Sequence, residues 1–193
     1  YILHKIFILD LSYKENLKNY NFHKLYKELL NFCALDLSSF YFDIRKDVLY
    51  CDNINSKKRK NCITVLNILL DCLLKWFAPI LVFTTEEIYN LIEKSDSSIH
   101  EKQFPKLNPG FRDNNLAEKW KNLYKIKQEA NIAIEEKRSI KEIGSSLEAE
   151  IEIFTNEENY RLLEKLNLPE YFITSKAQLF KNSADIKETI IKV

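Results

Sequence analysis

Aromatic and basic side chains gather in one stretch from Ser38 to Lys60, SSFYFDIRKDVLYCDNINSKKRK. Tyr41 and Arg45 are four residues apart, a spacing that places two side chains next to each other on a helix. A ring beside a guanidinium offers an RNA base a face to stack on and offers a phosphate a cation. The basic run KKRK follows at the expected start of the next helix, where backbone amides can also meet a phosphate. The candidate RNA-binding residues are therefore Tyr41, Arg45, Lys46, Lys57, Lys58, Arg59 and Lys60.

The same stretch also has an ordinary structural interpretation. Aromatic residues at helical spacing usually pack in a core, and a short basic run is usually a solvated face. On residue types alone this is the commoner outcome, so both interpretations stay open at this point.

Other chemistry is not indicated by the sequence. The three histidines are scattered, and no cysteines have C-x-x-C spacing, so neither a metal site nor Cys-His catalysis is expected. The four cysteines are expected to be reduced thiols of a cytosolic protein. With only 2 glycines the chain has no Gly-rich phosphate loop. We therefore expect no catalytic residues, no cofactor and no metal in this chain.

Composition predicts a helical protein. Apolar residues make up 46% of the 193 residues and aromatic residues 12%, which is enough for a core. The scarcity of glycine favours long elements with few turns. No apolar run is long enough to span a membrane. The net charge of +1 means that attraction to nucleic acid must come from local clustering. Since the chain begins Tyr-Ile-Leu-His and lacks methionine, we expect it to be an internal piece of a longer protein.

Five helices are expected from the spacing of apolar residues. They cover about residues 3–20, 22–44, 56–77, 84–93 and 116–137. The third is apolar nearly all round, so it should lie centrally. Thr84-Thr85-Glu86-Glu87 is predicted to cap the fourth helix as a capping box, with Phe83 and Ile88 as a hydrophobic staple. Residues 95–113 contain Pro and Gly and form a long crossover.

The pattern changes after Gly144. Residues 147–154 alternate between apolar and polar, which predicts a strand. A short helix is expected over residues 157–166, and strands are expected over Tyr171–Thr174 and from Ile186 to the end. We therefore predict a mainly α chain, with an antiparallel helical bundle over residues 1–142 and a small α+β extension over residues 143–193.

Three separated segments resemble one known family. FCALDLSSFYFDIRKDVLYCD (Phe32–Asp52) is similar to the helix pair of the anticodon-binding domain in bacterial isoleucyl-tRNA synthetases. VLNILLDCLLKWFAPILVFTTEEIY (Val65–Tyr89) resembles its next two helices, and IGSSLEAEI (Ile143–Ile151) resembles the passage into the C-terminal extension. The resemblance covers nearly the whole chain in the same order.

The resemblance implies a parent enzyme that attaches isoleucine to its tRNA with ATP and Mg²⁺. The ATP-site motifs and the C-terminal zinc module of that family do not occur in this chain. It implies three further properties: isoleucine tRNA and the parent's catalytic domain as partners, a monomeric state and a cytoplasmic location without membrane contact. It gives only a region for RNA contact, the exposed side of Ser38–Tyr50 with the basic run that follows. We assign the following residues to the core: Phe40, Phe42, Ile44, Leu69, Trp76 and Trp120.

Two alternatives remain beside RNA binding. In the first, the bundle is a scaffold that packs on the catalytic domain without direct RNA contact. In the second, the chain is a helical adaptor for another protein, which an exposed contiguous apolar strip would favour.

Overall fold

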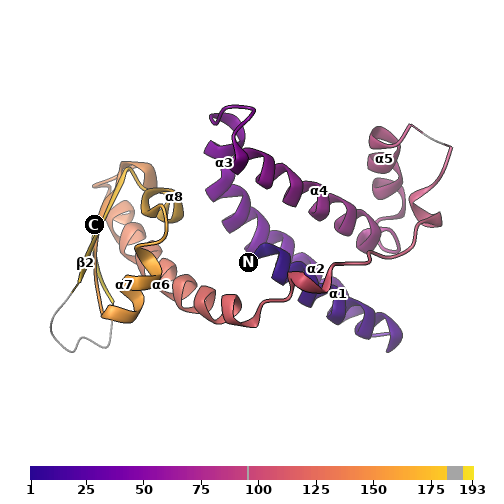
Figure 1. Cartoon of the computed structure of the whole chain (residues 1–193), viewed down its shortest axis with the longest axis horizontal. Helices are drawn as coiled ribbons and strands as arrows, with labels where there is room; N and C mark the ends of the chain where they lie inside the picture. The colour runs from indigo at the N-terminus through magenta and orange to yellow at the C-terminus, as the bar shows by residue number, and fades with distance from the viewer. Residues whose placement is uncertain (95, 182–188) are drawn as a thin grey trace. The chain divides into compact units, whose positions relative to one another are not determined.

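The chain forms two compact units in a computed structural model that describes residues 1–94, 96–181 and 189–193. One unit is Ile2–Arg112, and the other contains Tyr1 and Asp113–Val193. Figure 1 follows the chain through both units. The prediction of a mainly α chain that ends in a small α+β extension is confirmed.

The unit Ile2–Arg112 is built from helices. Its elements are α1 (Ile2–Lys18), α2 (Phe22–Asn31), the π-helix η1 (Phe32–Phe42), α3 (Asp43–Tyr50), α4 (Lys57–Phe77), α5 (Val82–Ile92) and the 3-10 helices η2 (Ile99–Glu101) and η3 (Pro109–Phe111). α2, η1 and α3 follow one another without a break, as Figure 1 shows. α4 packs against α1, α3 and α5, so the expectation that this helix lies centrally holds for this unit.

A buried polar network joins α1 to α4 in this unit. Tyr13 Oη donates a hydrogen bond to the Trp76 carbonyl oxygen at 3.0 Å, and Trp76 Nε1 donates to Asp10 Oδ1 at 3.3 Å. Lys14 Nζ lies 2.6 Å from Asp10 Oδ2, so the buried carboxylate has a cation beside it. Trp76 is 0% exposed, which confirms its assignment to the core.

The predicted capping box at Thr84 is wrong. α5 begins at Val82 with Leu81 as its N-cap, so Thr84 already lies inside the helix. Thr85 Oγ1 instead donates to the Leu81 carbonyl oxygen at 2.9 Å. Phe83 is 89% exposed and therefore makes no hydrophobic staple. The reason is the short turn after α4, in which the amides of residues 80 and 81 both bond to the Phe77 carbonyl and the next helix starts at once.

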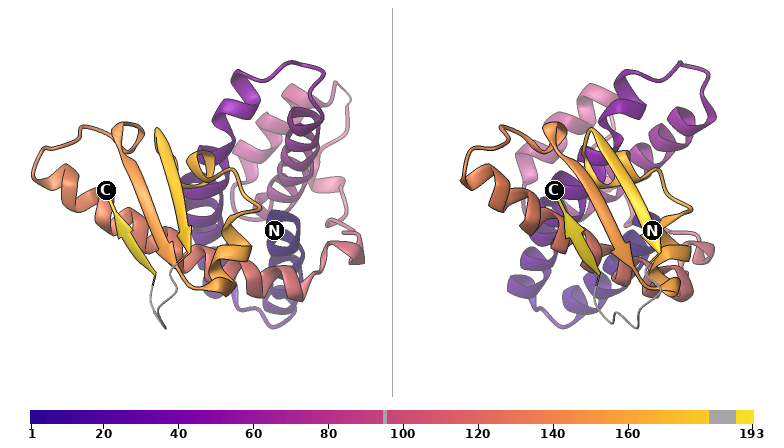
Figure 2. Two further views of the ribbon diagram at one scale, coloured as in Figure 1. Left: turned by 60° about the vertical axis from the view of Figure 1, so that its left-hand side comes forward. Right: turned by 90° about the vertical axis from the view of Figure 1, so that its left-hand side faces the viewer.

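The other unit combines helices with a small sheet. Its elements are α6 (Asn114–Ser139), the 3-10 helix η4 (Ser146–Glu148), β1 (Glu150–Thr155), α7 (Glu157–Leu163), α8 (Leu168–Phe172), β2 (Lys176–Lys181) and β3 (Ile190–Lys192). Figure 2 shows β1 between β2 and β3, parallel to β2 and antiparallel to β3. Ile151, Ile153 and Thr155 of β1 are buried, which confirms the predicted alternation. Lys127 of α6 donates to the Tyr171 carbonyl oxygen at 2.5 Å and so ties α6 to α8.

Two sequence-based expectations for this unit need correction. Tyr171–Thr174 is not a strand: Tyr171 and Phe172 end α8, and Ile173 follows in the left-handed region with φ 60°. Pro169 favours the start of a helix there, which outweighs the β propensity of the aromatic residues. β2 was not predicted, because its sequence KAQLFK carries lysines at both ends. In the predicted C-terminal strand, residues 186–188 lie outside the described residues, and 190–192 form β3.

α6 groups with the C-terminal part of the chain rather than with the preceding helices. By contacts, the boundary between units therefore falls at 112/113. Our boundary between a binding domain and an extension at 142/143 stays a prediction.

Candidate nucleic-acid interface

The π-helix η1 sets the direction of the aromatic side chains in the candidate region. Bonds between residues five apart widen each turn, and Ser39 Oγ donates to the Ala34 carbonyl, five residues earlier, at 2.7 Å. The apolar spacing expected from Phe22 to Ile44 is largely followed, since Leu25, Leu29, Leu37, Phe40 and Ile44 are buried and Cys33 is half-buried. Phe32 and Tyr41 are buried in addition. Phe22 is 55% exposed and Phe42, expected in the core, is 38% exposed.

Tyr41 is buried, and the expectation that it lies half-exposed beside Arg45 is wrong. It is 7% exposed, because the wider turn of η1 rotates it toward α4. Its hydroxyl lies 3.7 Å from Cys62 Sγ of α4. Burial, followed by the contact with Cys62, raises the pKa of Tyr41, while the hydrogen-bonded Arg45 guanidinium acts in the opposite direction. Tyr41 therefore joins η1, α3 and α4, and its ring is not available for stacking on a base.

Arg59 is the second candidate with a structural role. It is half-buried, and its Nη1 donates to the Asp52 carbonyl oxygen at 2.9 Å. Ser56 caps α4 by accepting from the Arg59 amide at 3.5 Å, and Ser56 Oγ also donates to Asp52 Oδ2 at 3.2 Å. Arg59 Nε is buried without a hydrogen-bond partner. The side chain therefore holds the turn between α3 and α4 rather than extending from it.

The five remaining candidate cations surround the junction of α3 and α4. We call this set the basic corner, and its members are Arg45, Lys46, Lys57, Lys58 and Lys60. Arg45 is half-buried and the four lysines are exposed. These residues come from two helices that pack against each other, α3 and α4. The contact between Tyr41 and Cys62 also joins the two segments.

The basic corner has two sides. On an α-helix with 3.6 residues per turn, Lys58 shares a strip with Cys62, which faces Tyr41 and α3. Lys57 and Lys60 fall on a different strip of α4. That strip continues through Thr64, Asn67 and Asp71, all exposed. The cations of the run KKRK therefore do not share one face of α4.

Lys46 pairs with a carboxylate of its own helix. Its Nζ lies 2.6 Å from Asp43 Oδ1, three residues earlier on α3. This hydrogen bond and the charge of Asp43 raise the pKa of Lys46. A phosphate would therefore have to compete with Asp43 for this cation.

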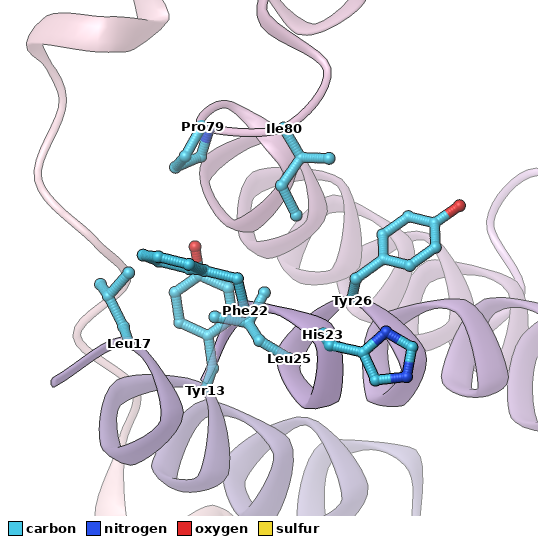
Figure 3. A pocket seen from close by; sticks show the side chains of 8 residues that line it. All are labelled: Tyr13, Leu17, Phe22, His23, Leu25, Tyr26, Pro79 and Ile80. Atoms are coloured by element: carbon cyan, nitrogen blue, oxygen red, sulfur yellow. The ribbon is translucent and has the colours of Figure 1, made fainter. Parts of the chain in front are cut away.

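An apolar pocket lies elsewhere on the same unit, and sequence reasoning missed it. It has a volume of about 510 Å³ and is lined by residues of α1, α2 and the turn after α4. Figure 3 shows Ile80 pointing toward the space between Phe22 and Tyr26 of α2. The four residues Ile80, Leu81, Val82 and Phe83 that follow Pro79 are all exposed. In the sequence, the available signal for an apolar surface was this run of four adjacent apolar residues after Pro79.

Among the residues that the structure describes, no group of three or more His, Cys, Asp or Glu side chains could hold a metal ion. No helix within the described ranges is both long and apolar enough to cross a membrane.

Comparison with known proteins identifies the class to which this basic, helical unit belongs. The family described as the anticodon-binding domain of tRNA ligase matches residues 1–153. The chain belongs to this family.

Particular relatives are tRNA ligases for isoleucine. The chain is 53% identical over 192 residues to the isoleucine–tRNA ligase of Pelagibacter ubique, covering 100% of this chain and 21% of that protein. It is 40% identical over 148 residues to the enzyme of Agrobacterium fabrum, covering 77% of this chain and 15% of the relative. The enzyme of Natranaerobius thermophilus is 37% identical over 174 residues, 89% of this chain and 19% of the relative. The chain thus spans about a fifth of the length of these relatives.

Proposed function

We propose that this chain is the part of an isoleucine–tRNA ligase that docks the anticodon arm of isoleucine tRNA. The basic corner carries the proposal, because its five cations lie on two helices that pack against each other, α3 and α4. Arg45, Lys46, Lys57, Lys58 and Lys60 contact RNA phosphates, and Tyr41 and Arg59 position them. Phosphate contacts fix the register and orientation of a nucleic acid rather than read its bases.

The mechanism is positional. By holding the anticodon arm, the chain orients the tRNA so that its acceptor end reaches a catalytic domain of the same polypeptide. That domain would use ATP and Mg²⁺ to attach isoleucine. The parent enzyme would be a cytoplasmic monomer. The assignment to part of an isoleucine–tRNA ligase is supported by the names of the relatives and by the share of their length that this chain covers.

The binding strength follows from the number of phosphates. With about four phosphates neutralised, the slope of log K against log salt concentration should be roughly −3, and the chain alone should bind with a Kd on the order of 10⁻⁴–10⁻⁶ M. Titration of the chain with isoleucine tRNA at several salt concentrations tests this. Salt-independent binding, or no binding at low salt, would contradict the proposal.

A second candidate function is a scaffold that docks another part of the same polypeptide. It is favoured by the apolar pocket and by the exposed run from Ile80 to Phe83, and the same apolar surface equally favours the adaptor for another protein. Charge reversal separates the two functions. If the chain is only a scaffold, Arg45→Glu and Lys58→Glu in the full-length enzyme leave the KM for tRNA unchanged. If the basic corner holds RNA, both variants raise that KM and leave the KM for isoleucine unchanged.

A further inference from the structure

A polar groove lies beside α4, on the strip that carries Lys57 and Lys60. It has a volume of about 500 Å³. One wall is the polar strip of α4, with Thr64, Asn67 and Asp71, and the other is the segment from Pro105 to Phe111. We call it the α4 groove. It lies within the unit Ile2–Arg112, and nothing in the function proposed above uses it.

The lining of the α4 groove combines an aromatic ring with amide groups. Phe111 is half-buried in the 3-10 helix η3, beside the half-buried Ile68 and Leu107. Asn67 and Asn108 are exposed at the rim. Unpaired RNA bases are bound by just such a combination, because rings stack on the base and amides both donate to and accept from its edge.

The wall that carries Phe111 is held by local hydrogen bonds. Asn108 Oδ1 accepts from the Gly110 amide at 2.8 Å, and the Phe111 amide donates to the Asn108 carbonyl oxygen at 3.0 Å. A Cβ at Gly110 would lie 3.2 Å from Asn108 Oδ1, so glycine allows this tight turn. The turn that carries Phe111 and Asn108 is therefore formed before any ligand binds, which lowers the entropy cost of binding.

Cations stand at two sides of the α4 groove. Lys60 lies seven residues before Asn67 on the same strip, which is two helical turns or about 10 Å. Lys106 is exposed on the opposite wall. Asp71 is the acidic member of the lining, and Lys75 Nζ lies 2.6 Å from its Oδ1. The negative charge is thus compensated within α4, and an anionic chain can approach from the side of Lys60.

We propose that the α4 groove takes one unpaired base of the bound tRNA, stacked on Phe111 with its edge on Asn67, and that Lys60 and Lys106 hold the flanking phosphates. This inference rests on the proposed function, since the basic corner must first bring the RNA to α4. It adds base contact to a surface that otherwise binds only phosphates.

The test uses the whole 193-residue chain and a fluorescent hairpin of the isoleucine tRNA anticodon arm. Phe111→Leu keeps apolar volume and removes the stacking face, so affinity should fall about 5- to 150-fold. Asn67→Ala should lower affinity about 2- to 12-fold. Asn61→Ala is the matched control, because Asn61 is an exposed residue of the same type on α4 outside the groove, and it should stay within about 2-fold.

Hairpins with one abasic position at a time identify the base. At the position whose base the groove binds, the loss of affinity caused by removing the base and the loss caused by Phe111→Leu should not add, because each change abolishes the same contact. If the circular dichroism of Phe111→Leu shows a loss of helix, the affinity of Asn67→Ala relative to Asn61→Ala decides whether the base site exists. An exposed residue such as Asn67 can be changed without loss of folding.

The outcomes separate the two proposals. If Lys58→Glu weakens binding while Phe111→Leu and Asn67→Ala bind like Asn61→Ala, the base site is refuted and the docking function stands. If the unaltered chain does not bind the hairpin at low salt, the docking function is refuted and the base site falls with it.

Discussion

Replacement of Tyr41 tests whether this residue supports the basic corner from inside. Tyr41→Phe removes the hydroxyl that contacts Cys62 Sγ at 3.7 Å and the Arg45 guanidinium, and it keeps the ring. Since sulfur is a weak partner, the lost bonds should lower the free energy of unfolding by about 1 kcal/mol. Tyr41→Leu also removes most of a ring that is 7% exposed, so its cost should be larger, about 2–4 kcal/mol.

The two variants should nevertheless bind RNA alike. Urea titration followed by circular dichroism measures stability, and anisotropy with the anticodon-arm hairpin measures affinity at a temperature where both variants are folded. A buried Tyr41 makes no stacking contact, so the affinity of the folded Tyr41→Leu protein should be within about 3-fold of that of Tyr41→Phe.

A stacked Tyr41 would give a different result. Loss of a base-stacking ring typically costs 5-fold or more in affinity, and Tyr41→Phe would keep the stack. A large drop in affinity for Tyr41→Leu alone, with little loss of stability, would refute the reasoning from burial.

Three further predictions concern stability and charge. Burial raises the pKa of Tyr13 to about 12, so the folded state retains a proton that the unfolded state loses near pH 10. The free energy of unfolding should therefore keep this contribution below pH 10 and lose it between pH 10 and 12. Tyr13→Phe should flatten that fall in unfolding curves recorded at alkaline pH. Trp76→Phe opens a cavity and removes the bond to the buried Asp10, so thermal or urea unfolding should show a loss of about 2–4 kcal/mol, and a loss below about 0.5 kcal/mol would contradict the network. Lys46→Ala breaks an exposed pair with Asp43 that the solvent screens, so the midpoint of urea unfolding should stay close to that of the unaltered chain, and a clear downward shift would contradict this.

The sequence was sufficient for the long helices, and the reason is periodicity. α4 and α6 begin and end close to the predicted residues, because apolar spacing, Ser56 as N-cap and Pro79 after the helix all agree. β1 was predictable in the same way from alternation. These are local signals, and nothing in the tertiary structure opposes them.

The orientation of Tyr41 could not be predicted, because it depends on the π-helix. A sequence pattern assumes 3.6 residues per turn, whereas the wider turns of η1 bury Phe32 and Tyr41 in addition to Phe40 of the expected apolar spacing. Tertiary packing of Tyr41 on Cys62 stabilises the orientation of Tyr41. The same limit explains Arg59, whose bond to the Asp52 carbonyl depends on the turn between two helices.

The apolar pocket and the α4 groove also could not be predicted from the sequence. The α4 groove needs Phe111 to lie opposite Asn67, and the segment from 105 to 111 carries no periodicity that would place it there. Thr64, Asn67 and Asp71 do recur at helical spacing in the sequence, and all three are exposed on α4.

The salt dependence of binding to isoleucine tRNA tests the central claim most directly. If about four cations of the basic corner meet phosphates, the slope of log K against log salt should be roughly −3, and Lys58→Glu should make it shallower by about one. Binding that does not change with salt, or a slope that Lys58→Glu leaves intact, would contradict docking of RNA by the basic corner.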